Sequence, residues 1–209
     1  AIKDGEYNTA LELLSNNNYV SAAKKFSKLG DYKDSKSLYQ QIIQQEPVLS
    51  VVSGNVGDKL QFGKYEWQIL KKEDNKVLII TTGIVAKRSY NEEWASITWE
   101  GCTLRKWLNN EFYNEFSDEE KLLIATTHLE NKSNAKYGTE GGNETDDKIF
   151  LLSIDEAKEY FADDEARAVG SWWWLRSPGY DGGNAANVTS DGSLHDYGNI
   201  VNSDYGVRP

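Results

Sequence analysis

The spacing of apolar residues changes at Pro47, and this change constrains the fold more than any other feature of the chain. Before Pro47, apolar residues recur at intervals of three and four, which is the period of an amphipathic helix. After Pro47 they alternate with polar residues, which is the period of a strand. The sequence therefore predicts a short all-α helical segment over residues 1–47 and an α+β domain over residues 48–209.

The helical segment carries a stop signal after each later helix. Gly30 is placed to end the second helix, Asp34 or Ser35 can cap the third, and Pro47 ends it. The stretch YVSAAKKFSKLGDYKDS resembles the tetratricopeptide-like repeats that precede other domains in bacterial surface proteins. One and a half repeats cannot bury both faces of a helical stack, so we expect a spacer or the end of a longer array.

The α+β domain opens with an expected hairpin. Apolar residues between Leu60 and Ile69 broadly alternate with polar neighbours, Asp74-Asn75 offers a turn, and KVLIITTGIV has the character of a buried return strand. These three features together predict two antiparallel strands.

Further elements follow along the domain. Residues 103–116 have helical spacing, and Ser117 with Glu120 and Ser153 with Glu156 form capping-box patterns at two helix starts. Residues 131–147 contain almost nothing to bury and predict a long loop, whereas KIFLLS predicts a short strand. From Trp172 onward, short strands alternate with Gly-containing turns.

Charge and cysteine content narrow the partners. The net charge is -10, and the whole acidic excess lies in residues 48–209, which hold 17 basic against 27 acidic residues. A surface this acidic repels phosphate backbones and anionic lipids, so we expect no nucleic-acid partner. No apolar stretch is long enough for membrane insertion. The single Cys102 excludes an internal disulfide, and we expect it to be a small buried hydrophobe.

Several segments in order carry a family resemblance: EWQILKKEDNKVLIIT, CTLRKWLNNEFYNEFSDEEK, DKIFLLSIDEAKEYF, WWLRSPG and the closing YGVRP. Together they resemble a bacterial domain family of the C-type-lectin-like group. The branch is the one that includes formylglycine-generating enzymes and the variable proteins of diversity-generating retroelements. The resemblance spans roughly residues 55–209 and implies twisted antiparallel strands, two or more helices and a loop-rich face. Fold alone does not supply a function.

Two departures from related proteins limit the chemistry that can be expected. Formylglycine-generating enzymes use a pair of cysteines, and this chain has only Cys102. The calcium-binding motifs of sugar-binding C-type lectins, Glu-Pro-Asn, Gln-Pro-Asp and Trp-Asn-Asp, do not occur. We therefore expect no enzymatic activity, no cofactor and no metal site.

The densest aromatic cluster, WWWLRSPG, directly precedes a run of small polar residues, Gly and Tyr. We interpret the first as a scaffold and the second as a display surface, because adaptable binding surfaces use Tyr, Asn, Ser, Gly and Asp. A competing hypothesis is that Asn, Asp and Gly only build turns there. The candidate ligand-binding residues are Tyr180, Asp181, Asn184, Asn187, Ser193, His195, Tyr197, Asn199, Asn202 and Asp204.

The resemblance adds a specific form of this hypothesis. In retroelement-diversified proteins, adenine-directed mutagenesis near the C-terminus changes Asn-type codons to Asn, Asp, Ser, Tyr, His, Gly or Ile. These residue types fill positions 180–205. The resemblance thus implies a diversified display surface, although related domains of fixed sequence have a similar composition.

Other polar and aromatic residues favour structural roles. We expect Arg176 and Arg208 to hold strand ends by hydrogen bonds to carbonyls or a carboxylate. Acidic clusters such as Asp146-Asp147 have no EF-hand spacing and favour solvated loop charge. In the run Trp172 to Trp174, at least one ring must point away from the others, because neighbours on a strand face opposite sides. An exposed Trp beside the polar run favours glycan stacking.

The sequence therefore predicts a binding module for a protein or glycan ligand. The alternatives are a structural module of a larger surface protein and, less favoured, an enzyme of the same fold branch. The repeat-plus-lectin-like architecture favours an extracellular or cell-surface location, and a cytoplasmic one stays open. Because the chain starts at Ala1 and contains no Met, we expect it to be part of a longer product.

Overall fold

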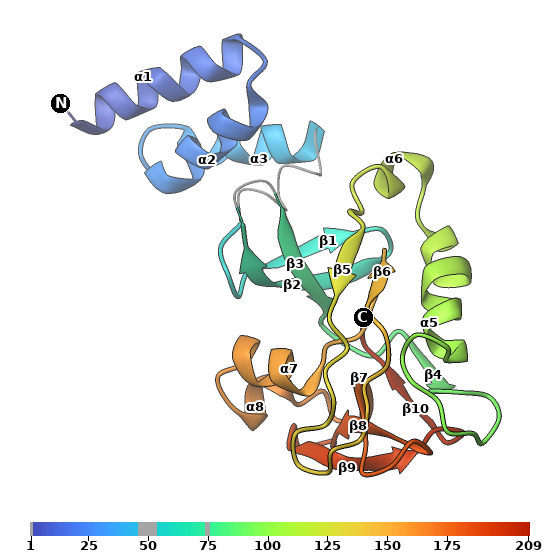
Figure 1. Ribbon diagram of the computed structural model, residues 1–209. Helices are drawn as coiled ribbons and strands as arrows, with labels where there is room; N and C mark the ends of the chain where they lie inside the picture. Colours follow the sequence, from blue (N-terminus) through green and yellow to red (C-terminus); the bar gives the residue numbers. More distant parts are fainter. Residues whose placement is uncertain (1, 46–53, 74–75) are drawn as a thin grey trace. The chain divides into compact units, whose positions relative to one another are not determined.

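The computed structural model describes residues 2–45, 54–73 and 76–209 and shows a mixed α+β protein (Figure 1). Helices lie at the N-terminal end, and antiparallel and mixed sheets with further helices follow. The chain divides into two compact units, residues 1–79 and 80–209. The expected boundary at Pro47 falls among residues 46–53, outside the described residues.

The N-terminal helices are α1 (Ile2–Ser15), α2 (Tyr19–Leu29) and α3 (Ser35–Gln45). Gly30 ends α2, as predicted, and its backbone N–H donates to the Ser27 carbonyl. The helices bury a small core in which the Tyr7 ring packs edge-on against Phe26 at 6.0 Å. The buried core residues are Tyr7, Ala10, Ala22, Ala23, Phe26, Leu29 and Ile42.

The first sheet has the order β1-β2-β3, with strands Lys59–Phe62, Tyr65–Lys72 and Val77–Thr81. The expected single strand over residues 60–69 is wrong, because a two-residue turn at Gly63-Lys64 divides it and places Phe62 opposite Tyr65. Gly63 has a φ of 59°, which favours glycine in such a turn. The expected turn at Asp74-Asn75 lies outside the described residues.

The C-terminal sheet has the order β4-β10-β7-β8-β9. Strand β10 (Asp204–Val207) runs parallel to β7 (Trp173–Pro178) and antiparallel to β4 (Ala86–Ser89). Strands β8 (Asn184–Val188) and β9 (Leu194–Ile200) complete the sheet with antiparallel pairing (Figure 1). Trp173 and Trp174 are both fully buried, although neighbours on a strand face opposite sides. Strand β7 is therefore covered on both faces.

Helical elements are placed by local signals. The predicted helix at 103–116 is confirmed as helical structure, in which α5 (Thr103–Trp107) continues into a π-helix (Leu108–Phe112) and a 3-10 turn (Tyr113–Glu115). Both predicted capping boxes are confirmed: Ser117 with Glu120 begins α6 (Asp118–Lys121), and Ser153 with Glu156 begins α7 (Ile154–Tyr160). Helix α8 (Asp164–Arg167) follows.

The strand predicted for residues 148–153 is wrong, because this stretch is irregular. Several of its backbone groups bond to side chains, and one backbone hydrogen bond to a strand, from the Arg176 N–H of β7 to the Leu152 carbonyl, does not make a strand ladder. Asn109 Oδ1 accepts from the N–H groups of Lys148 (2.7 Å) and Ile149 (3.2 Å), and Arg176 donates to the Leu151 carbonyl. Apolar side chains in this stretch are buried without strand pairing. An apolar pattern alone therefore led to the wrong prediction of a strand.

The predicted loop at 131–147 is confirmed over most of its length, but its end pairs with an earlier segment. Strand β6 (Thr145–Asp147) lies antiparallel to β5 (Thr127–Leu129). The loop between them, residues 130–144, thus starts and ends at one two-stranded ladder. Among the described residues, no helix combines the length and apolar character that a membrane span requires.

Candidate functional site

Three exposed tyrosines gather on the C-terminal unit, and we call them the tyrosine face: Tyr137, Tyr180 and Tyr197. The rings of Tyr180 and Tyr197 stack at 4.1 Å with an interplanar angle of 10°. Tyr137 meets them edge-on, at 6.5 Å and 5.8 Å. The exposed fractions are 37% for Tyr137, 40% for Tyr180 and 45% for Tyr197. The rings are thus held by one another and still face solvent.

The tyrosine face is assembled from three separate segments: the 130–144 loop, the turn after β7, and β9. Buried Asn134 fastens the loop, because its Nδ2 donates to the carbonyls of Pro178 (2.9 Å) and Asp196 (2.9 Å). A Cβ at Gly179 would lie 2.5 Å from the Tyr197 carbonyl oxygen, so only glycine permits this close approach. These contacts hold together the segments that carry the three tyrosines.

A polar edge adjoins the tyrosine face at Asp181. Oδ1 of Asp181 accepts from Asn184 Nδ2 (2.7 Å) and from the backbone N–H of Gly183 (2.9 Å). The hydrogen bond from Asn184, with others from Tyr180 and Gly183, lowers the pKa of Asp181. Hydrogen bonds to Asp181 and Tyr197 raise the pKa of Tyr180 to about 12. At neutral pH this edge therefore offers an ionised carboxylate, Asp181, beside the neutral phenol of Tyr180.

His195 connects the tyrosine face to Trp172. The His195 ring lies 6.2 Å from Tyr197 and 5.7 Å from Trp172. Its Nδ1 lies 3.2 Å from Oδ1 of Asn187, which is fully buried. Asn187 is therefore placed behind the surface as a support for His195. The Nδ2 atoms of Asn187 and Asn199 are buried and have no hydrogen-bond partner in the described part of the chain.

The structure brings only some of the predicted residues together. Ser193 lies at the turn between β8 and β9 and donates to Asp164. Asp204 lies on β10, paired with Ser89 of the edge strand β4, whereas Tyr197 lies on the other edge strand. Among the predicted residues, Tyr180, Asp181, Tyr197, Asn202 and Asp204 are exposed, Asn184, Ser193, His195 and Asn199 are half-buried, and Asn187 is buried.

Sequence reasoning missed two aromatic residues near this surface. Tyr137 lies in the loop that was expected to hold almost nothing to bury, and it is the third ring of the tyrosine face. Trp94 lies before α5 and is 69% exposed. An aromatic residue inside an otherwise polar loop was the available signal for each.

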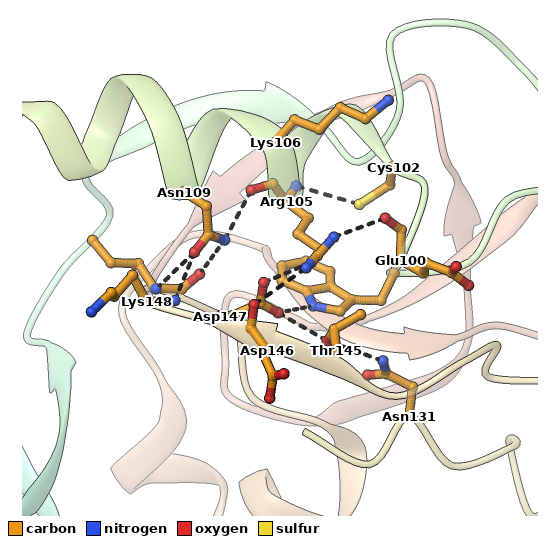
Figure 2. Close-up of polar contacts among 12 residues, drawn as sticks. Glu100, Cys102, Arg105, Lys106, Asn109, Asn131, Thr145, Asp146, Asp147 and Lys148 are labelled. Carbon is orange, nitrogen blue, oxygen red and sulfur yellow. Dashed lines mark hydrogen bonds and ion pairs between the residues drawn. The ribbon is translucent and has the colours of Figure 1, made fainter. Parts of the chain in front are cut away.

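A second polar cluster surrounds Asp147, and it is structural (Figure 2). Asp147 is 1% exposed, which makes the expected solvated loop charge wrong for this residue. Oδ1 accepts from Arg105 Nε (2.7 Å), and Oδ2 accepts from Trp99 Nε1 (2.9 Å) and Thr145 Oγ1 (3.0 Å). With both oxygens occupied and buried, this carboxylate is not available to a ligand.

Metal-ligating side chains and the one cysteine are two further features of the described part of the chain. Within residues 2–45, 54–73 and 76–209, no three His, Cys, Asp or Glu side chains are grouped to hold a metal ion. Cys102 is fully buried, as predicted, and burial raises the pKa of its thiol to about 12. Its Sγ accepts from the Arg105 N–H at the start of α5. Cys102 is thus a buried helix cap with an inert thiol.

A pocket of about 440 Å³ lies beside the 130–144 loop and α7. Its wall contains Arg176, which forms a two-pronged ion pair with Glu156 and donates to the Leu151 carbonyl. Burial alone would raise the pKa of Glu156, but the hydrogen bonds and charge of Arg176 outweigh burial and lower it. The predicted structural role of Arg176 is confirmed.

Arg208 has the same kind of role at the C-terminal end. Its guanidinium donates to the carbonyls of Thr81 (2.8 Å) and Arg167 (3.1 Å). It also lies over the ring of Trp173 at 5.0 Å. The predicted structural role of Arg208 is therefore confirmed as well, and neither buried arginine contributes to the tyrosine face.

The C-terminal part of the chain matches a family model described as a domain of unknown function (DUF6273), over residues 74–209. The match covers more than half of the chain, and the chain belongs to this family. Comparisons with curated proteins and with solved structures gave no match. All three residues of the tyrosine face lie within the matched residues.

Proposed function

We propose that this domain is a non-enzymatic ligand-binding module with a C-type-lectin-like fold, which binds a protein or glycan through the tyrosine face. The observation that carries the proposal is the exposed packing of Tyr137, Tyr180 and Tyr197, contributed by three separate segments. A chain that needed these rings only for stability would bury them, because burial is the source of their stabilising free energy.

The geometry of the rings favours binding. A tyrosine ring offers rigid contact area and a hydroxyl, and little side-chain entropy is lost when its rotamer is already fixed. Here Tyr180 and Tyr197 fix each other by stacking. The Asn134 hydrogen bonds hold the loop that carries Tyr137. Preorganisation of this kind raises affinity without requiring more contacts.

The binding proposal is tested with a labelled chain and a double variant, Tyr180→Ala with Tyr197→Ala. Both are screened on a printed array of defined glycans and on an array of purified surface proteins. Tyr113→Ala, a half-buried tyrosine outside the tyrosine face, is the matched control. We expect a ligand bound by wild type and control that the double variant loses by at least about tenfold. Equal binding by all three chains would show that the tyrosine face is not the site.

We propose further that the surface is diversified among copies of the gene. The residues expected to vary are the exposed ones, Tyr180, Asp181, Tyr197, Asn202 and Asp204. Asn187 is expected to stay constant, because a buried side chain changes packing and not the surface. Sequencing the region for residues 170–209 in many clones, with flanking DNA, tests this. A uniform segment without a template copy would refute diversification and leave the binding proposal standing.

We also propose that the module acts outside the cell or on its surface, with residues 1–47 as a tetratricopeptide-like spacer. Protease treatment of intact cells checks this location. Loss of the domain from intact cells is the expected result, and full protection until lysis would place it inside the cell.

A further inference from the structure

Trp94 is a large aromatic ring left open to solvent on a fixed loop. It is 69% exposed, more than any ring of the tyrosine face. Two hydrogen bonds hold the loop around it: Asn91 Nδ2 donates to the Glu93 carbonyl (2.8 Å), and the Ile97 N–H donates to the Gly182 carbonyl (2.9 Å). The second bond ties the Trp94 loop to the turn that carries Asp181. An exposed indole on an ordered loop is a feature of binding sites.

The indole lies beside the polar edge of the tyrosine face. A Cβ placed on Gly183 would lie 3.2 Å from Trp94 Nε1 and 3.4 Å from Asp181 Oδ1. The indole edge and the carboxylate therefore flank the same small space, which glycine leaves open. Asn184 orients this carboxylate by donating to Oδ1 at 2.7 Å. An exposed ring face thus has a carboxylate and a carboxamide within reach.

We propose that Trp94, Asp181 and Asn184 form a subsite for an uncharged sugar ring. The inference rests on the proposed binding function and narrows its ligand to a glycan. The C–H face of a pyranose is attracted to the negative face of an indole, and its hydroxyls donate to a carboxylate with charge-assisted strength. Asn184 supplies both a donor and an acceptor for a neighbouring hydroxyl.

Two observations favour a neutral glycan over other ligands. The ionised Asp181 and a net charge of -10 disfavour sialylated, sulfated or uronic sugars. The centres of protein interfaces are depleted in charged residues, whereas here a carboxylate lies next to the exposed ring. Because Tyr180 directly precedes Asp181, a saccharide longer than one ring would extend from Trp94 toward the tyrosine face.

The test uses the full chain and an array of neutral, sialylated and sulfated oligosaccharides, followed by calorimetric titration of the best neutral binder. We expect binding to neutral glycans and a loss of about tenfold or more for Trp94→Ala, with a smaller loss for Trp94→Phe. Gly183→Ala places a methyl group between the indole and Asp181 without removing either group, and we expect it to weaken binding too. Tyr113→Ala is the control, and thermal unfolding shows that each variant is folded.

Three outcomes would overturn the inference. Preference for acidic glycans would contradict the charge argument, and undiminished binding by Trp94→Ala would exclude the indole as platform. No binding of any neutral glycan at about 1 mM, the weak end of specific affinities, would exclude the subsite. If a surface protein is bound instead and the tyrosine double variant loses it, the proposed function stands and only the sugar subsite is refuted. If a surface protein is bound instead and the tyrosine double variant binds it like wild type, both proposals are refuted.

Discussion

Asp147 and Asp181 are carboxylates in opposite environments of the same unit. Asp147 is buried, and two of its three donors, Arg105 and Trp99, lie 42 and 48 residues away in sequence (Figure 2). Asp181 is exposed, and its donors Tyr180, Gly183 and Asn184 all lie within three residues of it. The first carboxylate joins distant segments, whereas the second shapes one turn and keeps its side chain at the surface.

The difference shows how to separate polar residues that hold the fold from those that can bind. Removing a buried group leaves its former partners without a hydrogen bond, which is costly, whereas water replaces the partners of an exposed group. In this pair, the buried long-range donors therefore mark the structural carboxylate, and the short-range donors mark the carboxylate that a ligand can reach.

The largest difference in the free energy of unfolding is expected between Asp147→Ala and Asp181→Ala. The first variant leaves Arg105 Nε and Trp99 Nε1 without their carboxylate acceptor, and we expect a loss of about 2–4 kcal/mol in the free energy of unfolding. The lower part of this range reflects the 23% exposure of the Arg105 side chain. For Asp181→Ala we expect less than about 1 kcal/mol. Urea unfolding of both variants measures the difference, and equal losses would break the comparison.

The next effect concerns two capping boxes of the same pattern. Glu156 also pairs with buried Arg176, whereas Glu120 at the start of α6 is a matched cap in a half-buried position. We expect Glu156→Gln to cost about 2–3 kcal/mol and Glu120→Gln less than about 1 kcal/mol. Chemical unfolding at neutral pH checks this order, and a larger loss for Glu120→Gln would contradict it.

The ion pair between Glu156 and Arg176 predicts that stability depends on pH. The pKa of Glu156 is lowered from 4.5, so its contribution to stability is present above that value and is lost as the pH falls through the lowered folded pKa. The stability difference between wild type and Glu156→Gln should therefore shrink in acid. A difference that grows as the pH falls would show that the Arg176 ion pair does not stabilise the charged form.

What the sequence predicted correctly depends on local signals. Both capping boxes and the Gly30 helix end lie within four residues of their partners, so short motifs identified them. The turn at Gly63 was missed because the alternation of apolar and polar residues shifts by only one residue between Phe62 and Tyr65. The whole stretch was therefore treated as one strand. The general α+β class followed from the change in period at Pro47.

What the sequence could not predict depends on long-range contacts. Asp146 and Asp147 are identical neighbours, yet only Asp147 is buried, because Arg105 and Trp99 converge on it. Of the predicted residues, Tyr180, Asp181 and Tyr197 lie together, but their neighbour Tyr137 comes from a loop 43 residues before Tyr180 in the sequence. No periodicity links a loop residue to a strand residue at that separation, so only the fold brings them together.

A smaller effect is expected at Asn134, which joins the two kinds of region. Its buried amide holds the 130–144 loop that carries the exposed Tyr137. We expect Asn134→Ala to cost about 1–3 kcal/mol, because the carbonyls of Pro178 and Asp196 lose their donor. Ser133→Ala, at an exposed neighbouring position, is the control. Hydrogen exchange of the loop and urea unfolding check the result; unchanged exchange would show that other contacts hold Tyr137.

The smallest effect concerns Asp146, the exposed neighbour of Asp147. His128 Nδ1 lies 3.0 Å from Asp146 Oδ1, and Nε2 lies 3.2 Å from Glu144 Oε2. The hydrogen bond to Asp146, with the charge of Glu144, raises the pKa of His128 above 6.5. A raised folded pKa adds stability that is fully present below the unfolded pKa and is lost as the pH rises through the folded value. Wild type should therefore melt at a higher temperature than His128→Gln. The gap between the two melting temperatures should be larger at about pH 5.5 than at about pH 8.5, because histidine titrates between these values. The shift should be far smaller than the effect of Asp147→Ala, because both partners of His128 are exposed and water screens the pair. An NMR titration of the His128 ring that gives a pKa at or below 6.5 would contradict this pairing and leave Asp147 as the only carboxylate of the two with a structural role.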